Sequence, residues 1–280
     1  MVLDRVGQWS ADKLEMLAKY LHAYAVIMAA QKRPRADGRP PWLDNFQYMD
    51  AFVGAATLEF RDRATARYLE GSPIVALNCD PPFDRRWFIE KNRARTRRLR
   101  DMLASREDGH RAQVVEGEAN ASLRALVSQL SRRQRAFAFL DPYGLQVEWA
   151  TVALLGESRR VDVFINFSLM GLTRNLRRQE PPSEEFRSTI RRVMVDDSWV
   201  DSLYMTQPDL FGGSLKSRSS LASAALAERY ATDLRTSFSH VSPPVIMRNT
   251  RRAPIYALVF ASHNQRAVAI MTDIMKTYRN

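Results

Sequence analysis

The chain of 280 residues has little cysteine and lysine, and it has no long apolar run. Its single cysteine, Cys79, excludes an internal disulfide and any zinc site built from several cysteines. No stretch approaches 18 consecutive apolar residues, so we expect no membrane span. The N-terminal residues MVLDRVGQWSADK lack the apolar segment of a signal peptide, which favours a cytoplasmic location.

Motifs of several common enzyme classes are also missing. The four histidines share no metal-ligand spacing, so we expect no metal site. The sequence contains neither a G-x-S-x-G motif nor a Walker A loop. These absences argue against a metalloenzyme, a serine hydrolase of the α/β-hydrolase type and a P-loop nucleotidase.

Arginine is the residue that the sequence has in excess. Of the 42 basic residues six are lysine, and the net charge is +11. Because guanidinium binds phosphate through two parallel hydrogen bonds, this composition favours a nucleic acid as partner. A genome rich in G and C, which encodes arginine in place of lysine on solvated surfaces, would give the same composition. The candidate nucleic-acid-binding residues are Arg97, Arg98, Arg174, Arg177 and Arg178.

Segments typical of strands alternate with segments typical of helices along most of the chain. The strand segments are apolar on both faces, which indicates a parallel sheet covered on both sides. We therefore predict one α/β domain over 1–280, Rossmann-like, with a mostly parallel twisted sheet and helices on both faces. The expected strands cover 47–54, 85–90, 112–117, 135–140, 161–167, 244–248 and 255–262, and the expected helices cover 9–31, 74–79, 91–105, 121–131, 148–156 and 263–278.

Two segments depart from this alternation. Residues 1–46 form an N-terminal helix and a loop, since proline and glycine interrupt the helical pattern over 32–42. Residues 171–243 contain two helical segments, 183–196 and 219–238, on either side of a polar Gly/Ser stretch. We expect 171–243 to be a helical insertion before the last strands.

Polar or acidic side chains stand at the carboxyl ends of the predicted strands, where open parallel sheets bind ligands. A glycine turn after the first strand lets the backbone approach a nucleoside, and an acid at the end of the second strand accepts both ribose hydroxyls. Alternatively, Gly54 only turns the chain and Glu90 caps the next helix, because a dinucleotide fingerprint has three glycines and this motif has one. The candidate cofactor-binding residues are Asp50, Phe52, Gly54, Ala55, Glu90, Glu118 and Asn120.

The fourth predicted strand ends in the tetrapeptide Asp-Pro-Tyr-Gly at 141–144. These residues suit a type I turn. They also suit a catalytic site, in which Asp141 accepts a hydrogen bond from the exocyclic amine of a flipped base and Tyr143 stacks on that base. The two interpretations are compatible, because a tight turn can present such an acid. The candidate catalytic residues are Asp141, Pro142 and Tyr143.

A second tetrapeptide of this kind, Asp-Pro-Pro-Phe, follows Cys79 at 80–83. It matches the signature of an amino-methyltransferase. We interpret it as a loop, because it lies between a predicted helix and the second strand and not at the end of a strand.

Taken together, these motifs resemble the three-Cys-motif partner protein family (TcmP). The resemblance covers most of the chain, and the segments that carry it are WSADKLEMLAKYL (9–21), YMDAFVG (48–54), EGSPIVAL (70–77), FIEKN (88–92), GEAN (117–120), FAFLDPYG (137–144), INFS and GLTRN within 165–175, and YALVFASHN (256–264). It implies a class I S-adenosylmethionine-dependent methyltransferase fold. It also implies a partner with a three-cysteine motif, which is similar to radical S-adenosylmethionine proteins.

The order of the motifs also resembles that of the adenine-N6 methyltransferases of large-subunit ribosomal RNA. That family has Asp-Pro-Pro-Tyr where this chain has Tyr143 and Gly144 at the last two positions. A methyltransferase often has a second glycine in the first motif, where this chain has Ala55 and Ala56.

Two hypotheses follow. The first is a methyltransferase-like protein that binds S-adenosylmethionine and acts on nucleic acid, with Asp50 and 52–56 near the methionine part and Glu90 at the ribose. Glu118 and Asn120 would then face the adenine. The second is a catalytically degenerate module on the same fold that binds nucleic acid or the partner. An enzyme acting on a small metabolite has no support beyond the fold.

Overall fold

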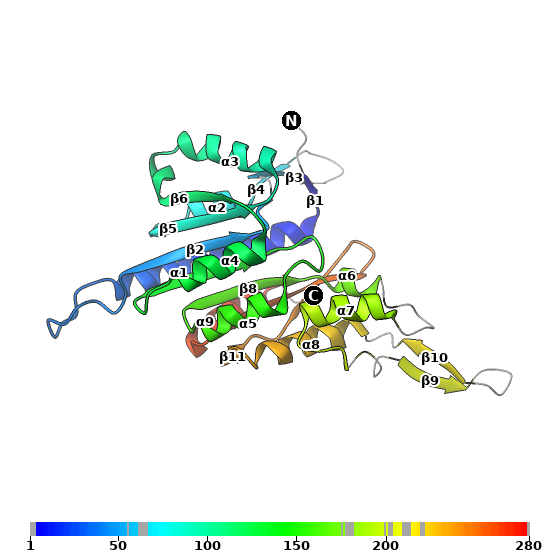
Figure 1. Cartoon of the computed structure of the whole chain (residues 1–280). Helices are drawn as coiled ribbons and strands as arrows, with labels where there is room; N and C mark the ends of the chain where they lie inside the picture. Colours follow the sequence, from blue (N-terminus) through cyan, green and yellow to red (C-terminus); the bar gives the residue numbers. More distant parts are fainter. Residues whose placement is uncertain are drawn as a thin grey trace.

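The computed structural model describes residues 4–54, 56–60, 67–174, 176, 182–198, 200, 204–208, 214–218 and 222–278 (Figure 1). Its strands are β1 (Asp4–Val6), β2 (Asn45–Ala51), β3 (Thr57–Phe60), β4 (Arg67–Glu70), β5 (Arg85–Glu90), β6 (Ala112–Glu116), β7 (Gln134–Leu140), β8 (Val161–Phe167), β9 (Tyr204–Pro208), β10 (Ser214–Arg218), β11 (His240–Val241), β12 (Val245–Arg248) and β13 (Pro254–Ser262). Its helices are α1 (Gln8–Gln31), α2 (Ser72–Leu77), α3 (Arg93–Ala104), the 3-10 helix Glu107–Arg111, α4 (Ala119–Ser128), α5 (Trp149–Glu157), α6 (Leu169–Thr173), α7 (Glu184–Val193), α8 (Ala222–Leu234) and α9 (Gln265–Lys276).

The main sheet has the strand order β11-β13-β8-β7-β2-β5-β6, and β12 also pairs with β13. The pairs formed by β6, β5, β2, β7 and β8 are parallel, whereas β13 runs antiparallel to β8. The strand order reverses between β2 and β7. This is the Rossmann-like, mostly parallel sheet that the sequence predicts, with one antiparallel strand inserted beside β8.

Helices cover both faces of this sheet (Figure 1). On one face α1, α2, α3 and α9 pack on an aromatic layer that includes Phe46, Tyr48, Phe137 and Phe260. On the other face α4, α5, α7 and α8 pack on smaller and aliphatic side chains such as Ala136. Successive residues of β7 point to opposite faces, so a strand buried on both sides must be apolar throughout.

Most predicted elements are confirmed, with boundaries that shift by up to four residues. The loop over 32–42 is also confirmed, and so is the loop at 80–83. The prediction for 171–243 is incomplete: the segment holds α7 and α8, but the residues between these helices also contain the antiparallel pair β9 and β10. The sequence analysis also missed β1, β3 and β4, which form a separate small sheet. These strands are three or four residues long, too short to carry a periodic apolar pattern.

No helix of the described residues is long and apolar enough to cross a membrane.

A buried arginine ties β5 to the end of α2. Arg86 is fully buried, and its Nε donates to the Ala76 carbonyl at 3.1 Å. Its Nη2 lies 3.4 Å from the Leu77 carbonyl and 3.3 Å from an Asp108 carboxylate oxygen. Because the last carbonyls of a helix lack helical partners, the guanidinium replaces the water that would otherwise solvate them.

Replacing this arginine will destabilise the fold. We expect Arg86→Leu to lower the free energy of unfolding by roughly 2–4 kcal/mol, since several acceptors lose their donor in a buried site. The neighbouring Arg85 is exposed, so Arg85→Leu is the matched control and will change stability by less than about 0.5 kcal/mol. Urea unfolding followed by circular dichroism measures both. Equal losses in the two variants would contradict the role of Arg86.

Candidate functional site

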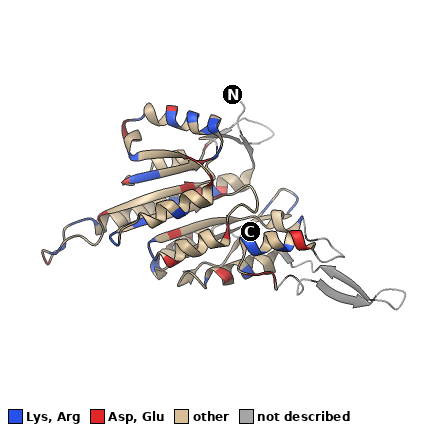
Figure 2. Ribbon diagram, viewed as in Figure 1, with Lys and Arg blue, Asp and Glu red and all other residues tan. Residues whose placement is uncertain are grey.

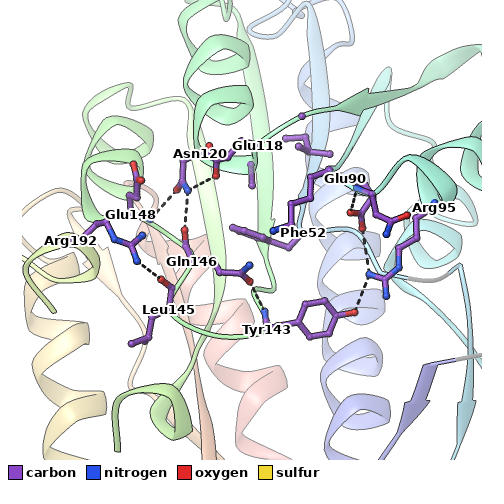
Figure 3. Close-up of a pocket in the computed structure, with 15 residues that line it drawn as sticks. Phe52, Glu90, Arg95, Glu118, Asn120, Tyr143, Leu145, Gln146, Glu148 and Arg192 are labelled. Carbon is purple, nitrogen blue, oxygen red and sulfur yellow. Dashed lines mark hydrogen bonds and ion pairs between the residues drawn. The ribbon is translucent and has the colours of Figure 1, made fainter. Parts of the chain in front are cut away.

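The carboxyl ends of β2, β5, β6 and β7 meet at one edge of the sheet, because these strands are parallel. A cavity of about 430 Å³ opens there, beside the point where the strand order reverses (Figure 3). Residues that follow each of the four strands line it, together with Arg95 from α3 and Arg192 from α7. Of the predicted site residues, the cavity brings together Phe52, Glu90, Glu118, Asn120 and Tyr143.

The backbone after β2 is strained at this cavity. Phe52 has a φ of 69°, in the left-handed region that side chains other than glycine rarely adopt. Such a residue costs on the order of 1–3 kcal/mol, and strain of this kind is concentrated at ligand sites. Gly54 does not have a left-handed φ, and a Cβ there would lie 4.0 Å from the Tyr143 hydroxyl. Ala55 lies outside the described residues.

Glu90 ends β5 and lies at the wall of the cavity. Its Oε1 accepts a hydrogen bond of 2.7 Å from the Asn92 backbone N–H, and its Oε2 lies 3.6 Å from Arg95 Nη1. The same Nη1 is 3.3 Å from the Tyr143 hydroxyl. Arg95 therefore bridges the ends of β5 and β7 across the cavity (Figure 3), a contact that the sequence analysis missed. Asn92, not Glu90, caps α3.

Glu118 and Asn120 use their side chains within the protein. Glu118 caps α4 by accepting from the Asn120 and Ala121 backbone N–H groups. Burial disfavours its ionised form, but these bonds prevail and hold its pKa below the ordinary value. Asn120 Nδ2 donates to Glu118 Oε1 and to the Gln146 carbonyl, and its Oδ1 accepts from the Glu148 backbone (Figure 3). Asn120 thus joins the loop after β6 to the loop after β7.

Asp141 follows β7 and is held by two other elements. One carboxylate oxygen pairs with Lys13 Nζ, and the other accepts a hydrogen bond of 2.6 Å from Asn166 Nδ2. Lys13 comes from α1 and is 4% exposed, while the Asp141 side chain is 26% exposed. No backbone hydrogen bond joins Asp141 to Gly144 among the described residues, so the expected type I turn is not closed by one.

The sequence analysis did not predict Lys13, although a signal for it exists. Lys13 lies four residues before Leu17 and on the buried side of α1 with Leu14 and Tyr20. A charged residue on the apolar face of an amphipathic helix needs a buried partner, because an unpaired ammonium there is costly. Its Nζ also lies 5.1 Å from the centre of the Trp9 ring.

Asp50 lies in β2, two residues before the strained Phe52, and is fully buried. The Tyr48 hydroxyl donates to its Oδ2 at 3.0 Å, and its Oδ1 has no hydrogen-bond partner among the described residues. Burial raises its pKa to about 7, against hydrogen bonds from Ser72 and Tyr48, and the negative charge of Asp141 acts in the same direction as burial.

Three of the five predicted nucleic-acid-binding arginines are among the described residues. Arg97 and Arg98 are exposed on α3, the same helix that supplies Arg95, and this helix carries much of the basic charge seen in Figure 2. Arg174 is exposed at the end of α6, which follows β8 at the same edge of the sheet. Arg177 and Arg178 lie outside the described residues.

Around the DPYG motif, Pro142 is buried and Tyr143 is 64% exposed. The Tyr143 backbone N–H donates to Gln146 Oε1 at 3.1 Å, and the Arg95 guanidinium lies 5.9 Å from the ring centre. A largely exposed aromatic ring beside a guanidinium can stack on a planar ligand.

We expect Asp50→Asn to flatten the pH dependence of stability. The folded-state pKa of about 7 is above the ordinary 3.8, so the unfolded chain loses this proton first as the pH rises. The contribution of Asp50 to the free energy of unfolding therefore falls between about pH 4 and pH 7, by at most about 1.4 kcal/mol per pH unit. Asparagine does not ionise, so the variant will lose less stability over this window.

Urea unfolding at pH 5 and pH 8 measures this difference. Asp162, whose pKa burial raises to about 6, contributes a fall of the same sign to both proteins, so the difference between them isolates Asp50. A variant whose stability falls as steeply as that of the wild type would show that Asp50 does not cause the fall.

No family model matches the sequence, and no curated protein matches it. Among solved structures, the chain is similar to protein LPL1258 from Legionella pneumophila str. Philadelphia 1, of the family-model DUF519. The TM-score is 0.53 at 11% sequence identity, over 97% of this chain and 92% of that one. A conserved hypothetical protein of Streptococcus pyogenes matches 45% of this chain and 70% of its own at 18% identity, with a TM-score of 0.31. The first similarity shows that the α/β fold is shared over nearly the whole chain.

Proposed function

We propose that the protein is a methyltransferase-like protein that binds S-adenosylmethionine and acts on an exocyclic base amine of a nucleic acid. The observation that carries this proposal is the cavity at the reversal of strand order, with Glu90 at the end of its second parallel strand. Its volume of about 430 Å³ is in the range of small-molecule sites. Open α/β sheets bind nucleotides at this position.

The residues present fit a nucleoside with a charged tail. The Glu90 carboxylate can accept the ribose hydroxyls, and apolar side chains such as Ile89 and Leu145 offer surfaces for the adenine ring. Because Glu118 and Asn120 are engaged with the loops, the edge of the adenine would meet the Ala119 backbone. Asp50, Phe52 and Gly54 would lie near the methionine part, where the unpaired Asp50 Oδ1 favours a hydrogen-bond donor.

Bound S-adenosylmethionine would supply an electrophilic methyl group to this site, and its sulfur would keep the electron pair of the broken sulfur–methyl bond as the thioether leaves. Asp141 would accept a hydrogen bond from the target amine and take up the proton that the amine loses when its nitrogen–carbon bond forms. Lys13 and Asn166 hold the carboxylate in place, and Pro142 fixes the backbone that leads to it. Tyr143 would stack on the base.

Exposed arginines support the nucleic-acid part of the proposal. Arg97 and Arg98 lie on α3, which also supplies Arg95 to the cavity, and Arg174 ends α6, which follows β8 at the same edge of the sheet. From there they could contact phosphates on either side of a base in the site. The resemblance to the three-Cys-motif partner protein family adds a protein with a three-cysteine motif as the partner with which this activity would operate.

A second function is favoured by a specific observation. Both carboxylate oxygens of Asp141 already have partners, which are Lys13 and Asn166. A substrate amine that approached the first of these oxygens would meet the Lys13 ammonium, which already occupies that position. The protein would then be a catalytically degenerate module that binds nucleic acid or the three-cysteine partner. The two functions differ in whether methyl transfer occurs.

Isothermal calorimetry with S-adenosylmethionine tests the cofactor. We expect the wild type to bind it and Glu90→Gln to weaken binding on the order of tenfold, through loss of a charged hydrogen-bond acceptor. Glu116→Gln is the matched control, because Glu116 ends the next strand but pairs with Arg93 and Thr96 and does not line the cavity. A wild type that gives no heat with millimolar ligand overturns the cofactor proposal.

Transfer of a radiolabelled methyl group to RNA, with and without the three-cysteine partner, tests the reaction. We expect Asp141→Ala to reduce transfer at least about a hundredfold and to leave RNA affinity nearly unchanged. Tyr143→Ala should reduce transfer as well, and its exposed position avoids a loss of folding. A wild type that binds RNA but transfers no methyl group under either condition would support the binding module instead.

A further inference from the structure

A second basic and aromatic surface lies away from the cavity, on the loop 32–44 between α1 and β2. This loop of thirteen residues projects from the amino-terminal edge of the sheet (Figure 1). Loops of this length without helix or strand are uncommon in compact domains and are often functional. The length of the 32–44 loop therefore indicates a role of its own, separate from that of the cavity.

The loop is held by specific contacts. The Gly38 N–H donates to the Arg35 carbonyl at 3.0 Å, in a turn where Gly38 has a φ of 74°. Arg133 Nη2 donates to the Pro41 carbonyl at 2.7 Å, and the Asp44 N–H donates to the Arg133 carbonyl at 2.8 Å. The loop and the residues before β7 thus form one ordered surface.

This surface displays a tryptophan to solvent. Trp42 is 67% exposed, and the Arg35 guanidinium lies 4.2 Å from the centre of its ring. Asp37 orients that guanidinium through a bond of 2.9 Å to Nη2. An indole ring kept in water beside a fixed guanidinium provides a platform on which a planar group can stack.

The surface is also basic. It carries five arginines, one lysine that pairs with Asp84, and two acids, which are Arg33, Arg35, Arg39, Arg132, Arg133, Lys32, Asp37 and Asp44. The guanidinium groups of Arg33 and Arg132 are exposed and make no ion pair or hydrogen bond with the part of the chain that the structure describes. Arg33 and Arg132 lie within two residues of Arg35 and Arg133, which contact Trp42 and Pro41. Exposed guanidinium groups combined with an exposed aromatic ring are typical of surfaces that bind single-stranded nucleic acid.

We propose that the 32–44 loop, with Arg132 and Arg133, is a second contact site for the nucleic acid, in which Trp42 stacks on an unpaired base and Arg33 and Arg132 bind phosphates. This inference rests on the nucleic-acid part of the proposed function and not on methyl transfer. We favour a nucleic acid over an acidic protein surface as the ligand, because a nucleic acid offers both groups that this surface can bind. Its bases can stack on the Trp42 ring, and the flanking arginines neutralise its phosphates.

The position of the loop sets the length of the ligand. The loop precedes β2, whereas the cavity lies beyond its other end, so the seven residues of β2 separate the two sites by at least about 23 Å. A strand stacked as in a duplex rises about 3.4 Å per nucleotide and an unstacked strand extends further, so one strand in contact with both sites must span several nucleotides. The substrate is then a polynucleotide with a single-stranded segment, and not a nucleotide or a dinucleotide.

Fluorescence anisotropy with a labelled 20-nucleotide oligouridylate and a 20-base-pair RNA duplex tests the inference. We expect Trp42→Ala to weaken binding of the single strand about 5- to 100-fold and to leave binding of the duplex unchanged, because only the single strand offers unpaired bases. Trp42→Phe retains a ring and should keep most of the affinity. Equal thermal midpoints confirm that the variants are folded.

A salt titration tests the arginines. Arg33→Ser with Arg132→Ser should reduce the slope of log affinity against log salt by about 1.4 for the single strand. Arg235→Ser with Arg266→Ser is the matched control, since it removes two exposed guanidinium groups elsewhere and should leave the slope unchanged.

The outcomes separate this inference from the proposed function. A wild type that binds RNA with salt dependence, together with a Trp42→Ala variant of equal affinity, overturns the inference alone; a loop that binds an acidic protein would give this result. Equal weakening for the single strand and the duplex also overturns it, because stacking on an unpaired base is then not involved. A wild type with no salt-dependent RNA binding overturns both.

Discussion

The pairing of β2 between β5 and β7, with both faces of the strand buried, is the constraint on which the rest of the structure depends. Its side chains alternate between the aromatic core on the α1 face and the aliphatic core on the α4 face. A polar group inside such a strand can satisfy its hydrogen bonds only through neighbouring side chains, and Asp50 does so in part. Polar groups that a ligand can reach therefore lie at the edge where the strands end, and the cavity lies at that edge.

The fold could be predicted from the sequence because continuous apolar runs and helical periodicity are strong local signals. Strands such as 161–167 and 85–90 were predicted at the observed boundaries. The pairs β3–β4 and β9–β10 were not, since each strand is short and polar residues interrupt it. The order of strands in the sheet is a non-local property, which the alternation of helices and strands narrows but does not determine.

The local motifs of the candidate site could likewise be predicted from the sequence, whereas its long-range side-chain contacts could not. Motifs at the ends of strands identified Phe52, Glu90, Glu118, Asn120 and Tyr143, and all five line one cavity. The sequence could not show which side chains are already engaged, because the partners are far apart in the chain: Lys13 and Asp141 are separated by 128 residues. Asn120, which was expected to face a ligand, instead connects two loops that form the wall.

The antiparallel position of β13 has a consequence for how the protein folds during synthesis. β8 can pair with β7 as soon as residue 167 has emerged from the ribosome, but its other edge has no partner until β13, which begins at Pro254, has emerged as well. Until then β8 is an unprotected edge strand of apolar residues, the kind of edge that pairs with other chains. The long segment between β8 and β13 thus delays completion of the sheet. Chains that end before β13 should aggregate through β8, although they contain all the residues that line the cavity.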